Sequence, residues 1–111
     1  MPENLIIQIV ASESTPEKEA EYDKWYTDVH IPMLFEYKGV KKAARYRLIG
    51  ENNEHARFLA IYEFESEESQ AAFSKSPEFA DAVHDFENTK EKIGFKIKWA
   101  ASYQLIKSWG R

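Results

Sequence analysis

The sequence contains no cysteine, and this absence excludes several kinds of chemistry at once. Disulfide bonds, thiolate nucleophiles and cysteine-ligated zinc are all ruled out, and the composition fits a reducing compartment. No apolar run approaches the roughly 20 residues that a helix needs to cross a bilayer. The first residues also lack the basic start of a signal peptide. We therefore expect a cytoplasmic protein that does not interact with a membrane.

An excess of charge of one sign is also lacking. The 111 residues carry 15 basic and 19 acidic side chains, so the net charge is −4. The basic residues are mixed with acidic ones and form no stripe that would neutralise phosphates, so a nucleic acid is not an expected partner. The densest basic group favours a protected edge strand and comprises Lys38, Lys41, Lys42, Arg45 and Arg47. The length suits a single domain over residues 1–111.

Short apolar runs rich in β-branched and aromatic residues predict four strands. The expected strands cover residues 5–11, 40–49, 57–65 and 95–108. The last of them alternates apolar and polar side chains with a period of two. A polar loop, residues 50–55, is expected to join the second and third strands as a hairpin.

A first helix is predicted from Thr15 to about Asp28, because Thr15 and Pro16 form a typical helix start. Pro32 disfavours helical geometry at the residue before it and is expected to separate this helix from a short extra turn. The predicted apolar face has helical spacing and consists of Tyr22, Trp25, Tyr26 and Val29.

A second helix is predicted after Ser66, which is a suitable N-cap. Ser76 and Pro77 repeat the cap-and-proline pattern, so this helix is expected to be kinked or restarted there. The predicted core stripe of this region is Phe79, Val83 and Phe86.

The resulting β-α-β-β-α-β order predicts an α+β fold of the ferredoxin-like type. We expect a four-stranded antiparallel sheet, with strands one and three in the centre and both helices on one face. The central strands are apolar on both faces, and leaving the second face in water costs about 25 cal/mol per Å². The simplest remedy is a homodimer that packs sheet against sheet and encloses a cavity. The alternative is a monomer whose long last strand folds back over the open face.

His30 is the strongest candidate for acid–base chemistry. It follows Tyr26 by four residues and lies at the predicted helix end, where the helix dipole favours imidazolium and raises the histidine pKa. Such a histidine can act as a general acid or base near neutral pH. Equally, it can simply cap the last helical carbonyls. His55 and His84 are expected in a solvated loop and on a helix surface.

Two polar residues interrupt the central strands, Gln8 and Glu63. If Leu5, Ile7 and Ile9 face the helices, Gln8 faces the open side. Glu63 can share that side and pair with Arg45 across the hairpin. In a pocket, Arg45 would bind an anionic oxygen; otherwise the pair is structural. The sequence has no zinc-type histidine pair, phosphate loop or nucleophile elbow, so no metal or cofactor is expected.

The segment from Glu21 to Pro32, EYDKWYTDVHIP, resembles the dimeric α+β barrel superfamily and, within it, the EthD-like group. In that group a WY-x-x-x-H-x-P segment closes the first helix, and the resemblance extends through nearly the whole chain. It implies two ferredoxin-like subunits whose sheets form a barrel, with a small hydrophobic or aromatic ligand between sheet and helices. Carried over by position, His30 is the motif histidine, and Trp25 and Tyr26 are the matching aromatic residues.

Three functions fit these observations. The first is a cofactor-independent isomerase, cyclase or lyase that acts on a small aromatic or polyketide-like compound. His30 is its expected catalytic residue, and the expected substrate-binding residues are Tyr22, Trp25, Tyr26, Arg45, Gln8 and Glu63. The alternatives are a cofactor-free monooxygenase in the same pocket and a non-catalytic ligand-binding or accessory dimer.

Overall fold

The computed structural model describes residues 5–51 and 54–111, and within them it confirms the predicted order of strands and helices. Asn52 and Asn53 of the predicted hairpin loop, and the N-terminal residues 1–4, lie outside the described residues. The elements are β1 (Ile6–Glu13), α1 (Glu19–Trp25), the π-helical segment η2 (Tyr26–His30), α2 (Ile31–Phe35), β2 (Val40–Arg47), β3 (Phe58–Phe64), α3 (Glu67–Phe73), α4 (Pro77–Thr89) and β4 (Lys96–Gln104).

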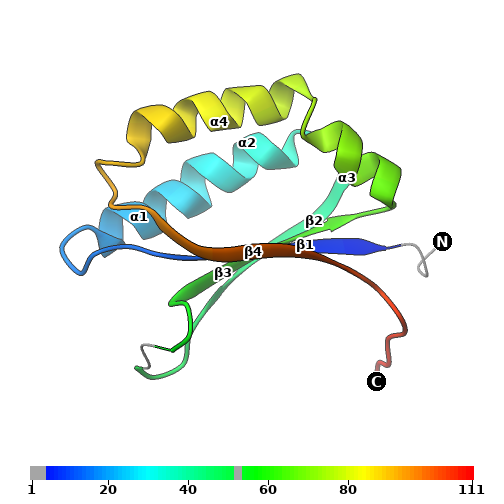
Figure 1. The fold of residues 1–111 in the computed structure, drawn as a ribbon, viewed down its shortest axis with the longest axis horizontal. Coiled ribbons are helices and arrows are strands. Elements are labelled where there is room, and N and C mark those ends of the chain that lie inside the picture. Colours follow the sequence, from blue (N-terminus) through cyan, green and yellow to red (C-terminus); the bar gives the residue numbers. More distant parts are fainter. Residues whose placement is uncertain (1–4, 52–53) are drawn as a thin grey trace.

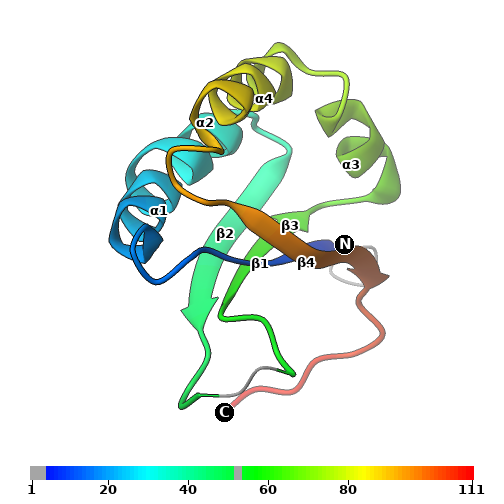
Figure 2. The ribbon, with the colours of Figure 1, turned by 60° about the vertical axis from the view of Figure 1, so that its left-hand side comes forward.

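The strands form one antiparallel sheet in the order β2-β3-β1-β4, which confirms the predicted central and edge strands. All the helices lie on one face of this sheet, as Figure 1 shows. The view in Figure 2 shows that no helix covers the opposite face. The described part of the chain is therefore a two-layer α+β fold of the ferredoxin-like type.

The structure contradicts the prediction about which face of the sheet the residues of β1 occupy. Gln8 pairs with Tyr62 of β3, which is buried, so both side chains point toward the helices. Ile7 and Ile9 occupy the open face instead. The prediction that Gln8 faces the open side is therefore wrong, because successive side chains of a strand alternate and Ile6 is the residue that enters the core.

The first helix begins at Glu19 rather than at Thr15 as predicted, because residues 15–18 form a separate turn in which the amide of Lys18 donates to the carbonyl of Thr15. The helix does not end near Asp28 as predicted but continues to Phe35 through η2 and α2. The amide of Ile31 donates to the carbonyl of Tyr26, five residues back, which widens the helix by one residue at this point. Pro32 then lies in the first turn of α2, where its missing N–H is tolerated. Val29 is 37% exposed, so its predicted place in the core is also wrong.

The second helical region is divided as predicted. Ser66 caps α3, and Ser76 caps α4, where its hydroxyl accepts a hydrogen bond from the amide of Phe79. Val83 was predicted in the core stripe but is 38% exposed, whereas Ala82 is fully buried. α4 packs against α2 and η2.

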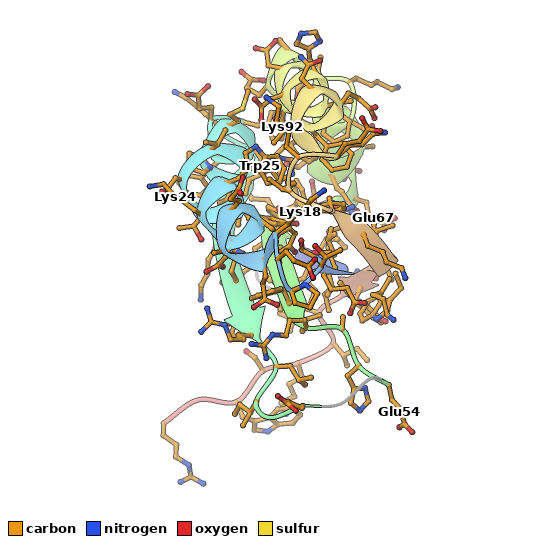
Figure 3. The ribbon with its side chains drawn as sticks, turned by 90° about the vertical axis from the view of Figure 1, so that its left-hand side faces the viewer. Lys18, Lys24, Trp25, Glu54, Glu67 and Lys92 are labelled. Carbon is orange, nitrogen blue, oxygen red and sulfur yellow. The ribbon has the colours of Figure 1, made fainter. Side chains whose placement is uncertain are left out.

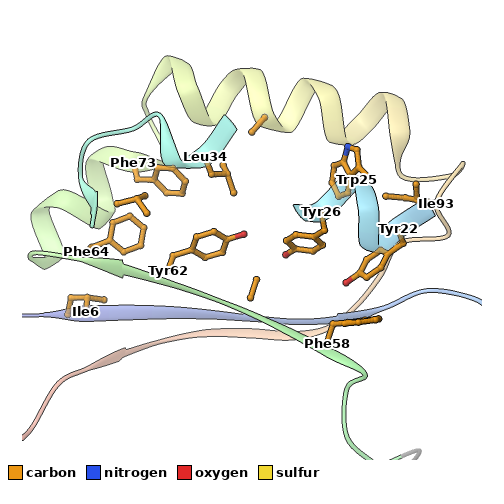
Figure 4. Close-up of a cluster of buried hydrophobic side chains, with 13 residues drawn as sticks. Ile6, Tyr22, Trp25, Tyr26, Leu34, Phe58, Tyr62, Phe64, Phe73 and Ile93 are labelled. Atoms are coloured by element: carbon orange, nitrogen blue, oxygen red, sulfur yellow. The ribbon is translucent and has the colours of Figure 1, made fainter. Parts of the chain in front are cut away.

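The core between sheet and helices is strongly aromatic, as the close-up in Figure 4 shows. Tyr22 and Phe64 have no exposed surface, and Tyr26 is almost fully buried. By contrast, residues 105–111 leave the sheet after β4 (Figure 1), and Ile106 and Trp109 are largely exposed. The last strand is shorter than predicted, and its continuation does not bury the open face.

Candidate ligand-binding site

A cavity of about 200 Å³ lies between the sheet and the helices. Its walls come from β1, η2, α2, β3, α3, α4 and β4. The residues that line it are Gln8, Val10, Tyr26, His30, Leu34, Tyr62, Phe73, Phe79, Ala82, Val83, Phe86, Phe95 and Ile97. Most of these side chains are apolar, and the polar atoms come from Gln8, Tyr26, His30 and Tyr62. Such a cavity suits a small, mainly apolar ligand that is oriented by a few hydrogen bonds.

His30 is positioned in the cavity wall by the π-helical segment. Its imidazole stacks on the indole of Trp25 at 4.6 Å between ring centroids and meets the ring of Tyr26 edge-on at 5.2 Å. A π-helical turn holds more residues than an α-helical one, so His30 meets both Tyr26, four residues before it, and Trp25, five residues before it. The Nδ1 atom of His30 is buried and has no hydrogen-bond partner among the described residues.

The electrostatic state of His30 is the reverse of the sequence-based prediction. Burial lowers its pKa from 6.5 to about 4, and the nearby carboxylate of Asp85 offsets only part of this effect. The prediction of a raised pKa fails because the chain remains helical beyond His30, so no free helix C-terminus faces the ring. At pH 7 the imidazole is neutral and can accept a proton.

Asp85 of α4 holds Trp25 in place beside His30. The indole Nε1 donates a hydrogen bond of 2.9 Å to Oδ2 of Asp85. Figure 3 shows Lys24 on the outer surface of α1, whereas Trp25 turns inward toward α4. Asp85 was not among the site residues predicted from the sequence. The signal that could have found it is an acidic residue next to Phe86, which lines the cavity from α4.

Tyr26 and Tyr62 supply two hydroxyl groups on the sheet side of the cavity, and Figure 4 shows these groups pointing toward one another. Burial raises the pKa of Tyr26 to about 12 and raises the pKa of Tyr62 well above its usual value of 10. Both are therefore neutral hydrogen-bonding groups at pH 7. Tyr62 was not selected from the sequence, because a tyrosine in an apolar strand is indistinguishable there from other core aromatic residues.

Arg45 lies behind Tyr26 rather than in the cavity wall. Its guanidinium carbon is 4.7 Å from the centre of the Tyr26 ring, and its Nη1 contacts Asp23 at 2.5 Å and the Thr27 hydroxyl at 2.8 Å. The predicted Arg45–Glu63 pair is wrong. Arg45 pairs in register with Ala60 on the helix side, whereas Glu63 pairs with Lys42 and Ile7 on the open face.

The structure thus brings three of the seven predicted site residues into the cavity wall, namely Gln8, Tyr26 and His30. Trp25 and Arg45 touch two of these from behind. Tyr22 lies deeper in the core, where its hydroxyl bonds to Ser12. Glu63 is separated from the cavity by the sheet.

A larger depression of about 640 Å³ lies near the β2–β3 loop and is lined mainly by polar side chains. Four of its charged groups are already paired, Arg57 with Glu19 and Lys98 with Glu13. These contacts are partly exposed, as expected for a solvated surface. Across residues 5–51 and 54–111, no three histidine or acidic side chains gather in a way that could hold a metal ion.

The sequence matches the family described as "Domain of unknown function (DUF4286)" over residues 5–100, so the chain belongs to this family. No curated protein matches it in sequence. No helix in the described part of the chain is both long and apolar enough to span a bilayer.

Several solved structures share the fold. A hydroxynitrile lyase from Passiflora edulis has a TM-score of 0.73 and 15% identity, and the match covers 98% of this chain and all of that one. An EthD family protein from Bacillus halodurans C-125 has a TM-score of 0.65 and 15% identity, with 86% and 96% covered. A dimeric protein of unknown function with a ferredoxin-like fold, from Bacteroides fragilis NCTC 9343, has a TM-score of 0.63 and 11% identity, with 91% and 96% covered. These structures confirm the predicted ferredoxin-like fold, which this chain shares with an EthD family protein.

Proposed function

We propose that this protein is a cofactor-independent lyase or isomerase that binds a small molecule in the cavity and transfers a proton with His30. One observation carries the proposal: the imidazole of His30 lines an apolar cavity, while its buried Nδ1 has no hydrogen-bond partner among the described residues. An unsatisfied buried polar atom costs about 1–3 kcal/mol, and a catalytic role is one reason why such an atom is retained. The shared fold with a hydroxynitrile lyase supports the reaction class.

The proposed proton transfer uses groups that are already in place. Neutral His30 takes a proton from a ligand hydroxyl or an acidic C–H, and Asp85 stabilises the imidazolium that forms. Tyr26 or Tyr62 donates a hydrogen bond to the ligand oxygen on which negative charge develops. In a lyase reaction the ligand hydroxyl becomes a carbonyl as the adjacent carbon–carbon bond breaks, and the imidazolium protonates the leaving group. In an isomerase reaction it returns the proton to another atom of the same molecule.

We expect the His30→Ala variant to lose about 10²–10⁴-fold in kcat/KM, because general acid–base catalysis contributes an effect of this size. The assay measures carbonyl release from neutral aromatic cyanohydrins and rearrangement of neutral lactones, with and without oxygen. His84→Ala is the matched control, since His84 is exposed. Equal turnover in wild type and His30→Ala would contradict the catalytic role. Binding without turnover would favour the accessory-dimer alternative. Turnover that strictly requires oxygen would favour the monooxygenase alternative.

We also propose that the protein is a homodimer that packs through the open face of the sheet. This face carries partly exposed apolar residues, and Trp99 and Tyr103 of β4 are 45% and 52% exposed. A depression of about 550 Å³ lies in it, between Tyr46, Leu59 and Trp99. Apolar patches of this kind mark interfaces, and the structurally similar Bacteroides fragilis protein is dimeric.

The Ile61→Lys variant is expected to be a monomer, because Ile61 lies at the centre of the open face and a buried lysine charge opposes sheet-to-sheet packing. Ala80→Lys, on the exposed outer side of α4, is the control and should remain dimeric. Light scattering after size-exclusion chromatography gives the molar mass of each. A monomeric wild type would contradict the proposal.

A further inference from the structure

The apolar character of the cavity wall restricts the polarity of the ligand, and the ionisation states of the wall residues restrict its charge. Within the described part of the chain, the titratable groups that line the cavity are His30, Tyr26 and Tyr62. Burial lowers the pKa of His30 and raises those of both tyrosines, so all three are uncharged at pH 7. Gln8 is the remaining polar residue in the wall and has no charge.

The charged groups behind the cavity wall do not compensate a charge in the cavity. Arg45 stands on the far side of Tyr26, where its Nη1 is bound to Asp23 and Thr27. Asp85 accepts the hydrogen bond of Trp25, and its carboxylate offsets only part of the burial cost of a positive charge on His30. Lys90 lies 5.8 Å from the Phe86 ring and pairs with Glu87 on the surface. A charged ligand would therefore meet no counter-ion in the cavity wall, and a cation would gain only partial compensation from Asp85 behind it.

The volume restricts the size of the ligand. An apolar cavity of about 150 Å³ can hold benzene, and sites for drug-sized ligands measure about 300–1,000 Å³. A cavity of about 200 Å³ therefore accommodates one ring with a short polar substituent. A fused ring system of polyketide size exceeds it.

We propose that the cavity selects an uncharged single-ring ligand with one hydroxyl or carbonyl group and rejects the carboxylate and ammonium analogues of the same shape. This inference rests on the cavity of the proposed function. The ligand hydroxyl donates to the imidazole of His30, or its carbonyl accepts from Tyr26 or Tyr62, while the ring packs against Phe73, Phe79 and Phe86. Burial of an unpaired charge in such surroundings is costly.

Benzyl alcohol, benzoate and benzylammonium differ in charge but hardly in size, and they test the inference directly at pH 7. We expect benzyl alcohol to bind at least about 100-fold more tightly than either ion, since an unpaired buried charge costs several kcal/mol. NMR titrations measure the dissociation constants, and the imidazole signals of His30 mark binding in the cavity. A naphthalene alcohol should bind at least about tenfold more weakly than benzyl alcohol.

Three variants control the interpretation. Ala82→Leu fills the cavity and should abolish benzyl alcohol binding, because Ala82 is a fully buried part of the wall. Gln8→Lys should restore benzoate binding, and Gln8→Glu should restore benzylammonium binding, since each supplies a counter-ion.

Benzoate that binds wild type as tightly as benzyl alcohol would overturn the inference, even if His30-dependent turnover is found. Selective binding of benzyl alcohol without any turnover would support the inference while the proposed enzyme function fails.

Discussion

Acidification from pH 7 to pH 4 is expected to lower the free energy of unfolding by about 3 kcal/mol through His30 alone. The pKa of His30 is about 4 in the folded protein and about 6.5 in the unfolded chain. The unfolded chain therefore binds more protons between these values, so stability rises with pH in this window. The contribution is fully present above pH 6.5 and is lost as the pH falls toward 4.

Urea unfolding of wild type and His30→Phe between pH 4 and pH 7 measures this contribution. The phenyl ring keeps the stacking on Trp25 but cannot titrate, so the pH dependence due to residue 30 disappears in the variant. The acidic residues titrate in both proteins and cancel in the difference. His84→Phe, at an exposed position, should keep the wild-type pH dependence. Parallel stability curves for wild type and His30→Phe would show that His30 is not buried in its neutral form.

The Arg45–Asp23 pair should respond very differently to the loss of each partner. Asp23→Ala is expected to cost about 2–3 kcal/mol, because it leaves the charge of Arg45 mostly buried and without its carboxylate. The cost is large because Nε and Nη2 of Arg45 already have no partner among the described residues. Arg45→Met should cost less than about 1 kcal/mol, because it removes the charge together with these unsatisfied donors and fills much of the same space.

A double-mutant cycle on these two residues, measured by urea unfolding, makes the prediction quantitative. In the Arg45→Met background, the further change Asp23→Ala should have little effect. The control is Lys41→Met, because Lys41 forms an exposed ion pair with Glu65 and such pairs contribute little. A larger loss for Arg45→Met than for Asp23→Ala would contradict the account of Arg45 as an incompletely paired buried charge.

The local signals in the sequence succeeded at two helix starts and failed at a third. Thr15 and Pro16 form a turn instead of starting the first helix, which begins at Glu19. Ser66 and Ser76 begin helices as predicted, because a cap depends on atoms only three residues away. Strands 1 and 3 are central as predicted, because they are apolar on both faces. The prediction at Pro32 failed, since the preference for a break was overcome by a widened helical turn that packs against the sheet and α4.

The order of elements, the antiparallel sheet with helices on one face, and the choice of His30 as a candidate could all be predicted from the residues alone. The side of the sheet that Gln8 and Glu63 occupy, the pairing of Arg45 with Asp23, and the neutral state of His30 depend on how distant segments pack together. The face of a strand depends on register, since a shift of one residue reverses every side chain. The pKa of His30 depends on how much water its surroundings exclude. Trp25, Tyr26 and Phe86 surround the ring, and Phe95 lies beyond them. These surroundings come from segments up to about 65 residues away from His30 in the chain.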